Sequence, residues 1–180
     1  MRNRLTTLIF LFFLFPFSTA FSQDSLAVSL PETWLGEWKG EMHLFYANGK
    51  TQKVAVELHI QKTENKGKWA WAIFYGEGEE KQKRAYELLA INSLKGKYLI
   101  DEKNSILLDA FFADNTLMSR FMVMNNLIMT IYRMEGESLY FENISGKDNL
   151  PNISGGKDDI PEVSSYPVSV LQRGILKKIK

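Results

Sequence analysis

Residues 34–40 read Trp34-Leu35-Gly36-Glu37-Trp38-Lys39-Gly40, so that two tryptophans and two glycines each recur at a spacing of four. From this stretch to about residue 145, apolar residues mostly alternate with polar ones, which is typical of strands that bury one face. Turns rich in Gly, Asn and Asp separate these strands at short intervals and leave no room for crossover helices. The pattern predicts an all-β, up-and-down antiparallel series of about nine strands, and closing it into a barrel removes the exposed edges of a flat sheet.

The first hairpin has a register that its turn predicts. A three-residue loop, Ala47-Asn48-Gly49 with Gly49 in the left-handed conformation, pairs Tyr46 with Lys50 and keeps the apolar and polar faces separate. A two-residue loop would mix the faces. The three-residue loop also sets Lys39 opposite Glu57, a favourable cross-strand pair. We therefore expect the bulged loop.

The first 22 residues have the composition of a cleaved export signal. A positive start is followed by a short apolar run, Leu8 to Phe17, and by a small-x-small cleavage site, Ala20-Phe21-Ser22. The apolar run is too short for a good membrane span, which makes an N-terminal anchor the weaker alternative. The sequence contains no cysteine, so disulfides, a thiol nucleophile and a lipidated cysteine are all excluded. We expect export to the periplasm or the cell exterior, but not a lipoprotein.

The segment after the predicted barrel differs in composition. Asn-Ile-Ser-Gly-Lys-Asp at 143–148 nearly recurs as Asn-Ile-Ser-Gly-Gly-Lys-Asp at 152–158, within a region rich in Gly, Asn, Asp and Pro. The last residues fit either a helix with Leu171 and Ile175 on one face, or an extra strand through Val168 and Val170. Either element would pack back on the barrel. The expected organisation is a signal peptide 1–22, a lead-in 23–32, a β-barrel domain 33–145, a spacer 146–165 and an apolar and basic C-terminal segment 166–180.

Gly36-Glu37-Trp38 resembles the Gly-x-Trp of the first lipocalin strand. The chain is also similar to uncharacterised secreted lipocalin-like proteins of bacteria, which share the Trp-x-Gly-x-Trp-x-Gly start, a stretch like 98–106 and a tail like 166–171. The resemblance implies a lipocalin-like (calycin) barrel that forms a cup for a small apolar ligand. It also implies that Trp38 closes the barrel floor and that Arg173 packs over its ring. It implies no known activity.

No group of residues carries a catalytic, cofactor or metal signature. His43 and His59 fall on the polar face of the first hairpin, too far apart to share a metal and unable to face a lumen, which argues against a haem-binding barrel. The paired carboxylates Glu79-Glu80 sit in a solvated loop. A metal site at Asp148, Asp158 and Asp159 is disfavoured because no EF-hand pattern is present. We expect no catalytic residue, cofactor or metal, and the formal net charge of +1 argues against nucleic acid as a partner.

The hairpin around Asn125-Asn126 provides the sharpest ligand hypothesis. One of its faces holds Arg120, Met122, Met129 and Arg133. If this face looks inward, the arginines could clamp a carboxylate while the methionines adapt to an apolar tail. We favour the alternative in which both arginines lie outside, because a buried unpaired arginine is costly. The residues of the opposite face that would then fill the core are Leu117, Phe121 and Tyr132.

Trp69 and Trp71 alternate on one face of a further strand. They fit the core or floor of the barrel better than a role in stacking on a ligand. The sequence as a whole predicts a secreted, non-enzymatic binding protein for a small apolar or amphipathic molecule, such as a lipid or an organic acid. The competing hypothesis is a filled barrel that acts as a protein-interaction or structural module, and an enzyme with an unrecognised site is less favoured. The candidate ligand residues are Arg120, Arg133, Met122, Met129, Trp69 and Trp71.

Overall fold

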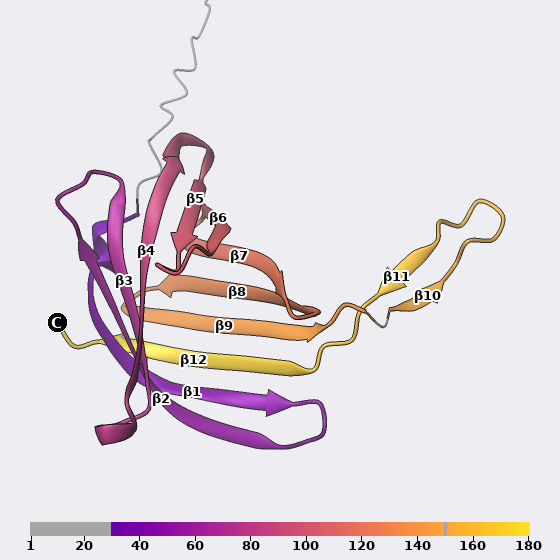
Figure 1. The fold of residues 1–180 in the computed structure, drawn as a ribbon, viewed down its shortest axis with the longest axis horizontal. Helices are drawn as coiled ribbons and strands as arrows, with labels where there is room; N and C mark the ends of the chain where they lie inside the picture. Colours follow the sequence, from indigo (N-terminus) through magenta and orange to yellow (C-terminus); the bar gives the residue numbers. More distant parts are fainter. Residues whose placement is uncertain (1–29, 150) are drawn as a thin grey trace, which may run out of the picture.

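The computed structural model describes residues 30–149 and 151–180, so the predicted signal peptide lies outside the described residues. Ten antiparallel strands of this part of the chain form one closed barrel (Figure 1), in the order β1-β12-β9-β8-β7-β6-β5-β4-β3-β2. The barrel strands are β1 (Gly36–Tyr46), β2 (Thr51–Lys62), β3 (Lys68–Tyr75), β4 (Gln82–Asn92), β5 (Lys97–Asp101), β6 (Leu107–Ala113), β7 (Thr116–Val123), β8 (Asn126–Glu135), β9 (Ser138–Lys147) and β12 (Val170–Lys178). The remaining elements are strands β10 (Asn152–Ser154) and β11 (Val163–Ser165) and the 3-10 helices η1 (Glu32–Trp34), η2 (Gly78–Glu80) and η3 (Ser93–Lys95).

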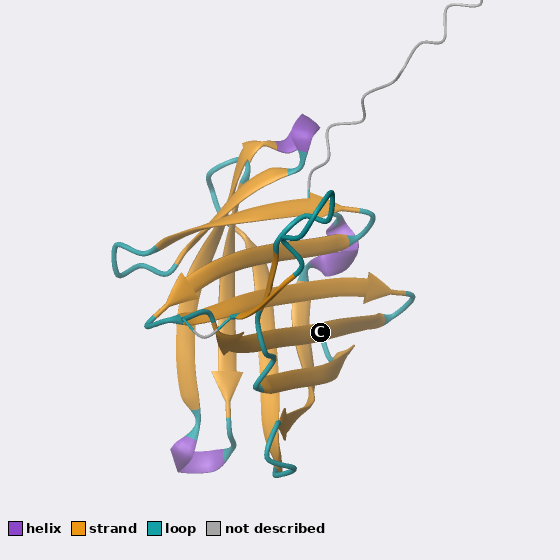
Figure 2. Ribbon diagram, turned by 90° about the vertical axis from the view of Figure 1, so that its right-hand side faces the viewer, coloured by secondary structure: helices purple, strands orange, loops and turns teal. Residues whose placement is uncertain are grey.

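The strand order confirms the predicted up-and-down barrel. Strands β1 to β8 each pair with the next strand along the chain, and the C-terminal β12 then fits between β9 and β1. The helical alternative for the C-terminal segment is therefore wrong. A strand at this position pairs the edges of β1 and β9, which a helix would leave open. The 3-10 helices η2 and η3 lie at opposite ends of β4 (Figure 2).

The first hairpin has the predicted register. Lys39 pairs with Glu57 across β1 and β2, and the ammonium of Lys39 lies 3.6 Å from the carboxylate. The Tyr46 N–H donates to the carbonyl of Lys50 over 3.0 Å. Gly49 has a φ of 82°, which is the left-handed conformation that the bulged loop requires.

The late hairpin turns one residue earlier than predicted. Met124 and Asn125 occupy the turn with φ values of 49° and 57°, so that Val123 pairs with Asn126 and Arg120 with Met129. The amide of Asn126 donates to the carbonyls of Val123 and Met124 and stabilises this turn. A turn at Asn125-Asn126 predicts that Val123 pairs with Ile128 and Arg120 with Ile131, and these pairs are wrong by two residues. Because the shift is even, each residue keeps its face of the sheet.

The recurring glycines of residues 34–40 allow β12 to approach β1 closely. A Cβ on Gly40 would collide with the carbonyl of Ile175, and a Cβ on Gly36 would collide with the carbonyl of Lys180. Gly36 also has a φ of 130°, a conformation that side chains rarely adopt. The absence of side chains at these two positions therefore allows β12 and the residues after it to lie close to β1.

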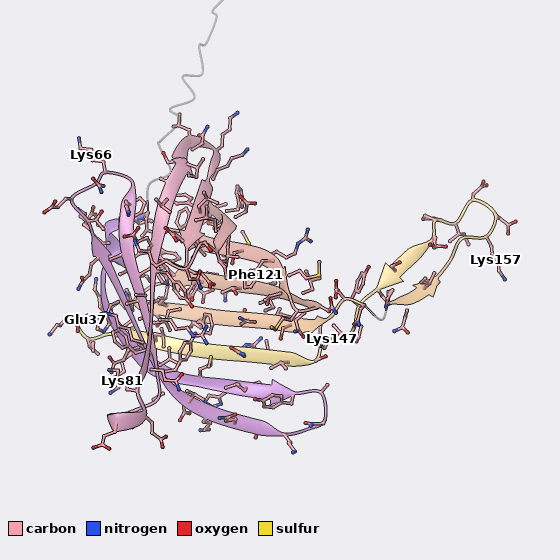
Figure 3. All side chains as sticks on the ribbon, in the orientation of Figure 1. Glu37, Lys66, Lys81, Phe121, Lys147 and Lys157 are labelled. Carbon is pink, nitrogen blue, oxygen red and sulfur yellow. The ribbon has the colours of Figure 1, made fainter. Side chains whose placement is uncertain are left out.

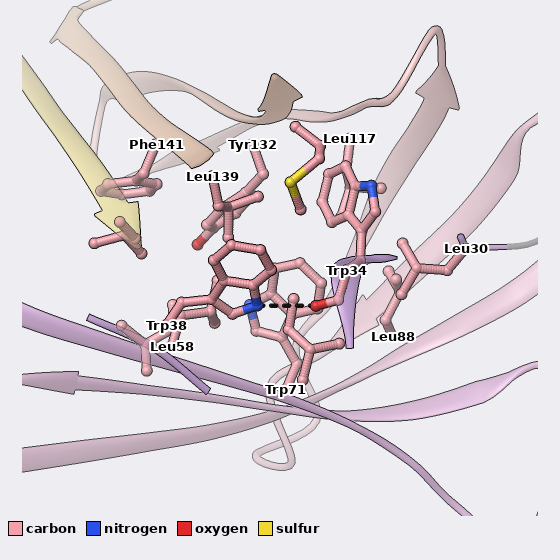
Figure 4. Packing of buried hydrophobic residues seen from close by; sticks show 14 of the residues in the cluster. Leu30, Trp34, Trp38, Leu58, Trp71, Leu88, Leu117, Tyr132, Leu139 and Phe141 are labelled. Atoms are coloured by element: carbon pink, nitrogen blue, oxygen red, sulfur yellow. Dashed lines mark hydrogen bonds between the residues drawn. The ribbon is translucent and has the colours of Figure 1, made fainter. Parts of the chain in front are cut away.

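One end of the barrel is packed solid by aromatic side chains (Figure 4). Trp34 of η1 is completely buried, and the indole N–H of Trp38 donates to its carbonyl over 2.9 Å. The ring of Trp34 packs edge-on against Phe112, with centroids 5.5 Å apart. Other buried members of this floor are Leu58, Ile60, Trp69, Leu88, Tyr98, Leu117, Leu139 and Leu176.

Residues 151–165, the later part of the predicted spacer, form an arm that projects away from the barrel (Figure 1). Strands β10 and β11 pair with each other as a separate two-stranded sheet, and all their residues are exposed. The second copy of the Asn-Ile-Ser repeat forms β10, whereas the first copy lies in β9 of the barrel. Lys157 lies at the far end of the arm (Figure 3).

Candidate ligand-binding cavity

The half of the barrel opposite the floor encloses a cavity of about 720 Å³. Its lining includes residues where β3 leads into β4, in the loop after β5 and at the tip of the β7–β8 hairpin. Phe121, which points into the barrel (Figure 3), contributes to its wall. The other main apolar side chains that line it are Met42, Trp71, Ile73, Ile100, Ile128, Tyr132 and Phe141.

The inward face of β4 changes from polar to apolar along the barrel axis. Gln82, Arg84 and Tyr86 line the cavity in turn, and Leu88 below them is buried in the floor. These residues alternate along one strand and therefore share a face. Arg84 pairs with the buried Ile73 of β3, which also lines the cavity. The cavity thus has a polar mouth and an apolar interior.

A group of hydrogen-bonding side chains gathers at this mouth. Arg84 is exposed to solvent and lies beside Tyr86, whose phenol raises the pKa of the guanidinium. Burial raises the pKa of Tyr75 to about 12, and the nearby Tyr86 adds to the rise while Arg84 opposes it. Tyr75 is therefore protonated at neutral pH, and its hydroxyl can donate a hydrogen bond. Glu102, which follows β5, lines the cavity beside this group.

The opposite wall carries polar groups of a different kind. The amide of Asn143 on β9 donates weakly to the hydroxyl of Thr130 on β8 over 3.4 Å, and both line the cavity. Gln172 of β12 lies beside them in the lining. These side chains are neutral, so the charged groups of the described cavity lining are confined to Arg84 and Glu102.

The two arginines proposed as a clamp lie on the outer face of the barrel. Arg120 is exposed, and Arg133 pairs with Glu135 over 2.5 Å and lies over the ring of Tyr140. The interpretation that places both arginines outside is therefore correct. The opposite face of the hairpin points inward, where Leu117 is buried in the floor.

The candidate methionines divide between the two surfaces. Met122 is 59% exposed and lies at the rim of the cavity. Met129 lies on the outside, where it lines a second, shallow hollow of about 660 Å³ across β5, β6 and β7 together with Arg120 and Met118. The face of methionine and arginine noted in the sequence thus borders an external groove.

Trp69 and Trp71 are both core residues, as expected. Trp69 packs against Tyr98 of the floor with ring centroids 6.2 Å apart. Trp71 lines the inner end of the cavity and meets Tyr132 edge-on with centroids 5.0 Å apart. Trp71 is therefore the one of the pair that a bound molecule could touch.

The predicted partner of Trp38 at the floor is wrong. Arg173 pairs with Glu142 of β9 at 2.7 Å and projects outward. The ammonium that lies over the Trp38 ring belongs to Lys178, 5.3 Å from the centroid, because β12 pairs Lys178 with Trp38. Gly36 and Trp38 take the positions expected of them at the start of β1.

Sequence reasoning missed the polar group at the mouth. The signal was present in the alternation of β4, where Arg84 is the one charged residue on a face shared with Tyr86 and Leu88. A cation on a strand face that also carries large apolar side chains, here Tyr86 and Leu88, is a candidate for the lumen. The loop that brings Glu102 to the same mouth follows β5 and carries no such periodicity.

Two further properties concern the described residues alone. No group of three or more His, Asp or Glu side chains in residues 30–149 and 151–180 is arranged to hold a metal ion. Within the same residues, none of the helices has the length and apolar character needed to cross a membrane.

No protein-family model matches the sequence, and the search of curated proteins found no match. Among solved structures, the S-type phycobiliprotein lyase from Guillardia theta is similar with a TM-score of 0.57 and 11% identity, over 83% of this chain and 90% of the lyase. A DUF3598-family protein of unknown function from Nostoc punctiforme has a TM-score of 0.56 and 12% identity over 84% of this chain, which spans 50% of that protein. Rv2717c from M. tuberculosis has a TM-score of 0.50 and 9% identity, over 83% and 94% of the two chains. At these identities the likenesses show a shared barrel fold and nothing of function.

Proposed function

We propose that this protein binds a small amphipathic molecule in the lumen of its barrel. The observation that carries the proposal is the cavity of about 720 Å³, which is closed below by the tryptophan floor and open at a polar mouth. Pockets of this size that are mainly apolar, with a few placed polar groups, are typical of small-molecule sites. The apolar part of the ligand lies against Trp71 and Tyr132, and its polar part lies at the mouth.

The N-terminal leader supports a place of action outside the cytoplasm. Its charged start, apolar run and cleavage site have the order of an export signal. The proposal is therefore that of a carrier or sensor of small molecules in the periplasm or cell exterior. It agrees with the similarity, read from the Trp-x-Gly-x-Trp-x-Gly start, to secreted lipocalin-like proteins of bacteria.

A variant that fills the lumen tests this function. Thr130→Trp places an indole in the cavity, whereas Ile131→Trp places the same group on the outer face of β8. The mature chain and both variants would be purified natively from a lipid-rich host and compared by native and then denaturing mass spectrometry. We expect a stoichiometric extra mass on the wild type and on Ile131→Trp, and none on Thr130→Trp. A wild-type protein that carries no ligand and takes up none of a panel of lipids and organic acids would contradict the proposal.

The alternative of a protein-interaction module rests on the arm. Strands β10 and β11 bury none of their residues, and Ile153 and Ile160 are 64% and 62% exposed. Apolar side chains held out on a projecting hairpin are available to a partner. Ile153→Glu should leave ligand retention unchanged if the lumen is the functional site.

A further inference from the structure

Arg84 is the sole cation among the described residues that line the cavity. Its strand position opposite Ile73 and next but one to Tyr86 sets it on the inward face, above the apolar interior. Among the described residues Arg84 forms no ion pair with a carboxylate. Nearby lysines do, since Lys68 pairs with Glu87 and Lys81 pairs with Glu57. A guanidinium that is partnered by phenols retains donors for a ligand, because it carries five N–H groups in a planar fork.

Tyr75 and Tyr86 supply further donors beside the guanidinium. Tyr75 precedes the mouth on β3, and its register partner Gln82 lies two residues before Arg84 on β4. Tyr86 interacts with both Arg84 and Tyr75. When the guanidinium donates to the phenol oxygen of Tyr86, the hydroxyl of Tyr86 is left free to donate. Three donor groups thus surround one corner of the mouth.

Glu102 places a negative charge at the same mouth as the positive charge of Arg84. It lines the same cavity, and its carboxylate already accepts a weak hydrogen bond from the amide of Asn104 over 3.5 Å. Its effect on Arg84 is smaller than that of either tyrosine. The mouth therefore carries three hydrogen-bond donor groups and one carboxylate. Removing the charge of Glu102 by mutation would make the net charge of the mouth more positive.

We propose that Arg84, with the hydroxyls of Tyr75 and Tyr86, forms an anion site that holds the carboxylate head of an amphipathic ligand while its tail enters the lumen. The inference rests on the proposed function and adds the chemical class of the ligand. A carboxylate matches the fork of a guanidinium in a two-point hydrogen bond. The tail then lies along the polar-to-apolar gradient of β4 toward Trp71.

Three probes with the same tail and different heads test the site. Decanoate, 1-decanol and decyltrimethylammonium would be titrated into the delipidated mature protein by calorimetry at neutral pH. The variants are Arg84→Gln, Arg84→Lys, Glu102→Gln and the control Lys83→Gln, which removes a cation from the neighbouring position on the outer face of β4. Circular dichroism and thermal unfolding would show that each variant keeps its fold.

We expect Arg84→Gln and Glu102→Gln to change the affinity for decanoate in opposite directions. Arg84→Gln weakens decanoate binding about tenfold, in line with the loss of a charge-assisted pair of hydrogen bonds, and leaves 1-decanol unchanged. Glu102→Gln strengthens decanoate binding a few-fold through the removal of a repelling charge. Lys83→Gln changes neither, and Arg84→Lys keeps part of the affinity because it retains the charge without the fork.

Two results overturn the anion site while the lumen function survives. One is 1-decanol binding that Thr130→Trp abolishes, together with decanoate binding that Arg84→Gln does not weaken. The other is tighter binding of decyltrimethylammonium than of decanoate to the wild type, which would assign the head to Glu102. If none of the three probes binds the wild type, the anion site fails, and the proposed function fails with it when the natively purified protein also carries no ligand.

Discussion

The two halves of this barrel are built from the same strands and the same alternation, yet one half is full and the other hollow. In the floor, Trp34 and Leu139 are completely buried and Trp38 is 2% exposed. In the open half, inward residues such as Phe121 and Ile128 are only partly buried and border the cavity. The two halves differ in the volume of side chains that fill the lumen. The floor is filled because η1, which precedes β1, places the indole of Trp34 at its centre. Alternation therefore decides which residues face inward, while side-chain size and a plugging segment decide whether the lumen is filled.

Removing the plug is the strongest test of this contrast. Trp34→Ala should lower the free energy of unfolding by about 3–5 kcal/mol, because it leaves a large cavity in a packed core. Ile128→Ala in the open half should lower it by about 1 kcal/mol or less, since its neighbours already border open space. Urea unfolding of the two variants measures both values. Equal losses would mean that the two halves are packed alike.

The pairing of β1 with β12, which closes the barrel, gives the second test. Gly40→Val forces a side chain against the carbonyl of Ile175 and should cost about 2–3 kcal/mol through overpacking and backbone shift. Gly49→Val serves as a control for added bulk, although its positive φ carries a strain cost of its own. Hydrogen exchange should show lost protection along β12 in Gly40→Val and not in Gly49→Val. Retained protection there would contradict the role of Gly40 in closing the barrel.

The sequence was sufficient for the strands and for the first register. Alternation from Gly36 onward and the Ala47-Asn48-Gly49 loop predict elements that the structure contains. These predictions succeed because period and turn chemistry are local properties of the chain. The helix or strand choice for the C-terminal segment could not be made, since Leu171 and Ile175 fit both periods and the free edges of β1 and β9 decide it.

The site was less accessible to sequence reasoning. The arginines of the late hairpin drew attention because they stand among methionines, but Arg133 finds a partner in Glu135 on the outer face. The partner of Trp38 was misplaced because a shift of five residues along β12 separates Arg173 from Lys178. Which cation reaches a ring depends on the register of strands that are far apart in the chain. Such pairings cannot be read from local patterns.

Alkaline titration tests the burial of the mouth. The pKa of Tyr75 is raised from 10.0 to about 12 by burial, so the native state binds its proton more tightly than the unfolded state does. This contribution to stability is complete below pH 10 and is lost as the pH rises through 12, by at most about 2.7 kcal/mol. Tyr75→Phe should flatten that part of the stability profile. Urea unfolding at pH 8 and pH 11 measures the difference, and equal slopes in wild type and variant would show that Tyr75 is not buried in solution.

The smallest expected change in the free energy of unfolding concerns Trp38 in the floor, where Lys178 and Arg173 can be compared as partners of its ring. Lys178 lies 5.3 Å from the ring centroid of Trp38, so Lys178→Met should cost about 0.5–1 kcal/mol at this exposed site. Arg173→Met removes an exposed ion pair with Glu142 and should cost about 0.5 kcal/mol or less. A double-mutant cycle with Trp38→Leu separates the two, because the coupling energy should be measurable for Lys178 and absent for Arg173. Coupling of Trp38 to Arg173 would instead place the guanidinium over the ring, and the register of β12 against β1 would then have to differ in solution. The cycle therefore tests, through one small energy, the strand pairing that closes the barrel around its filled half.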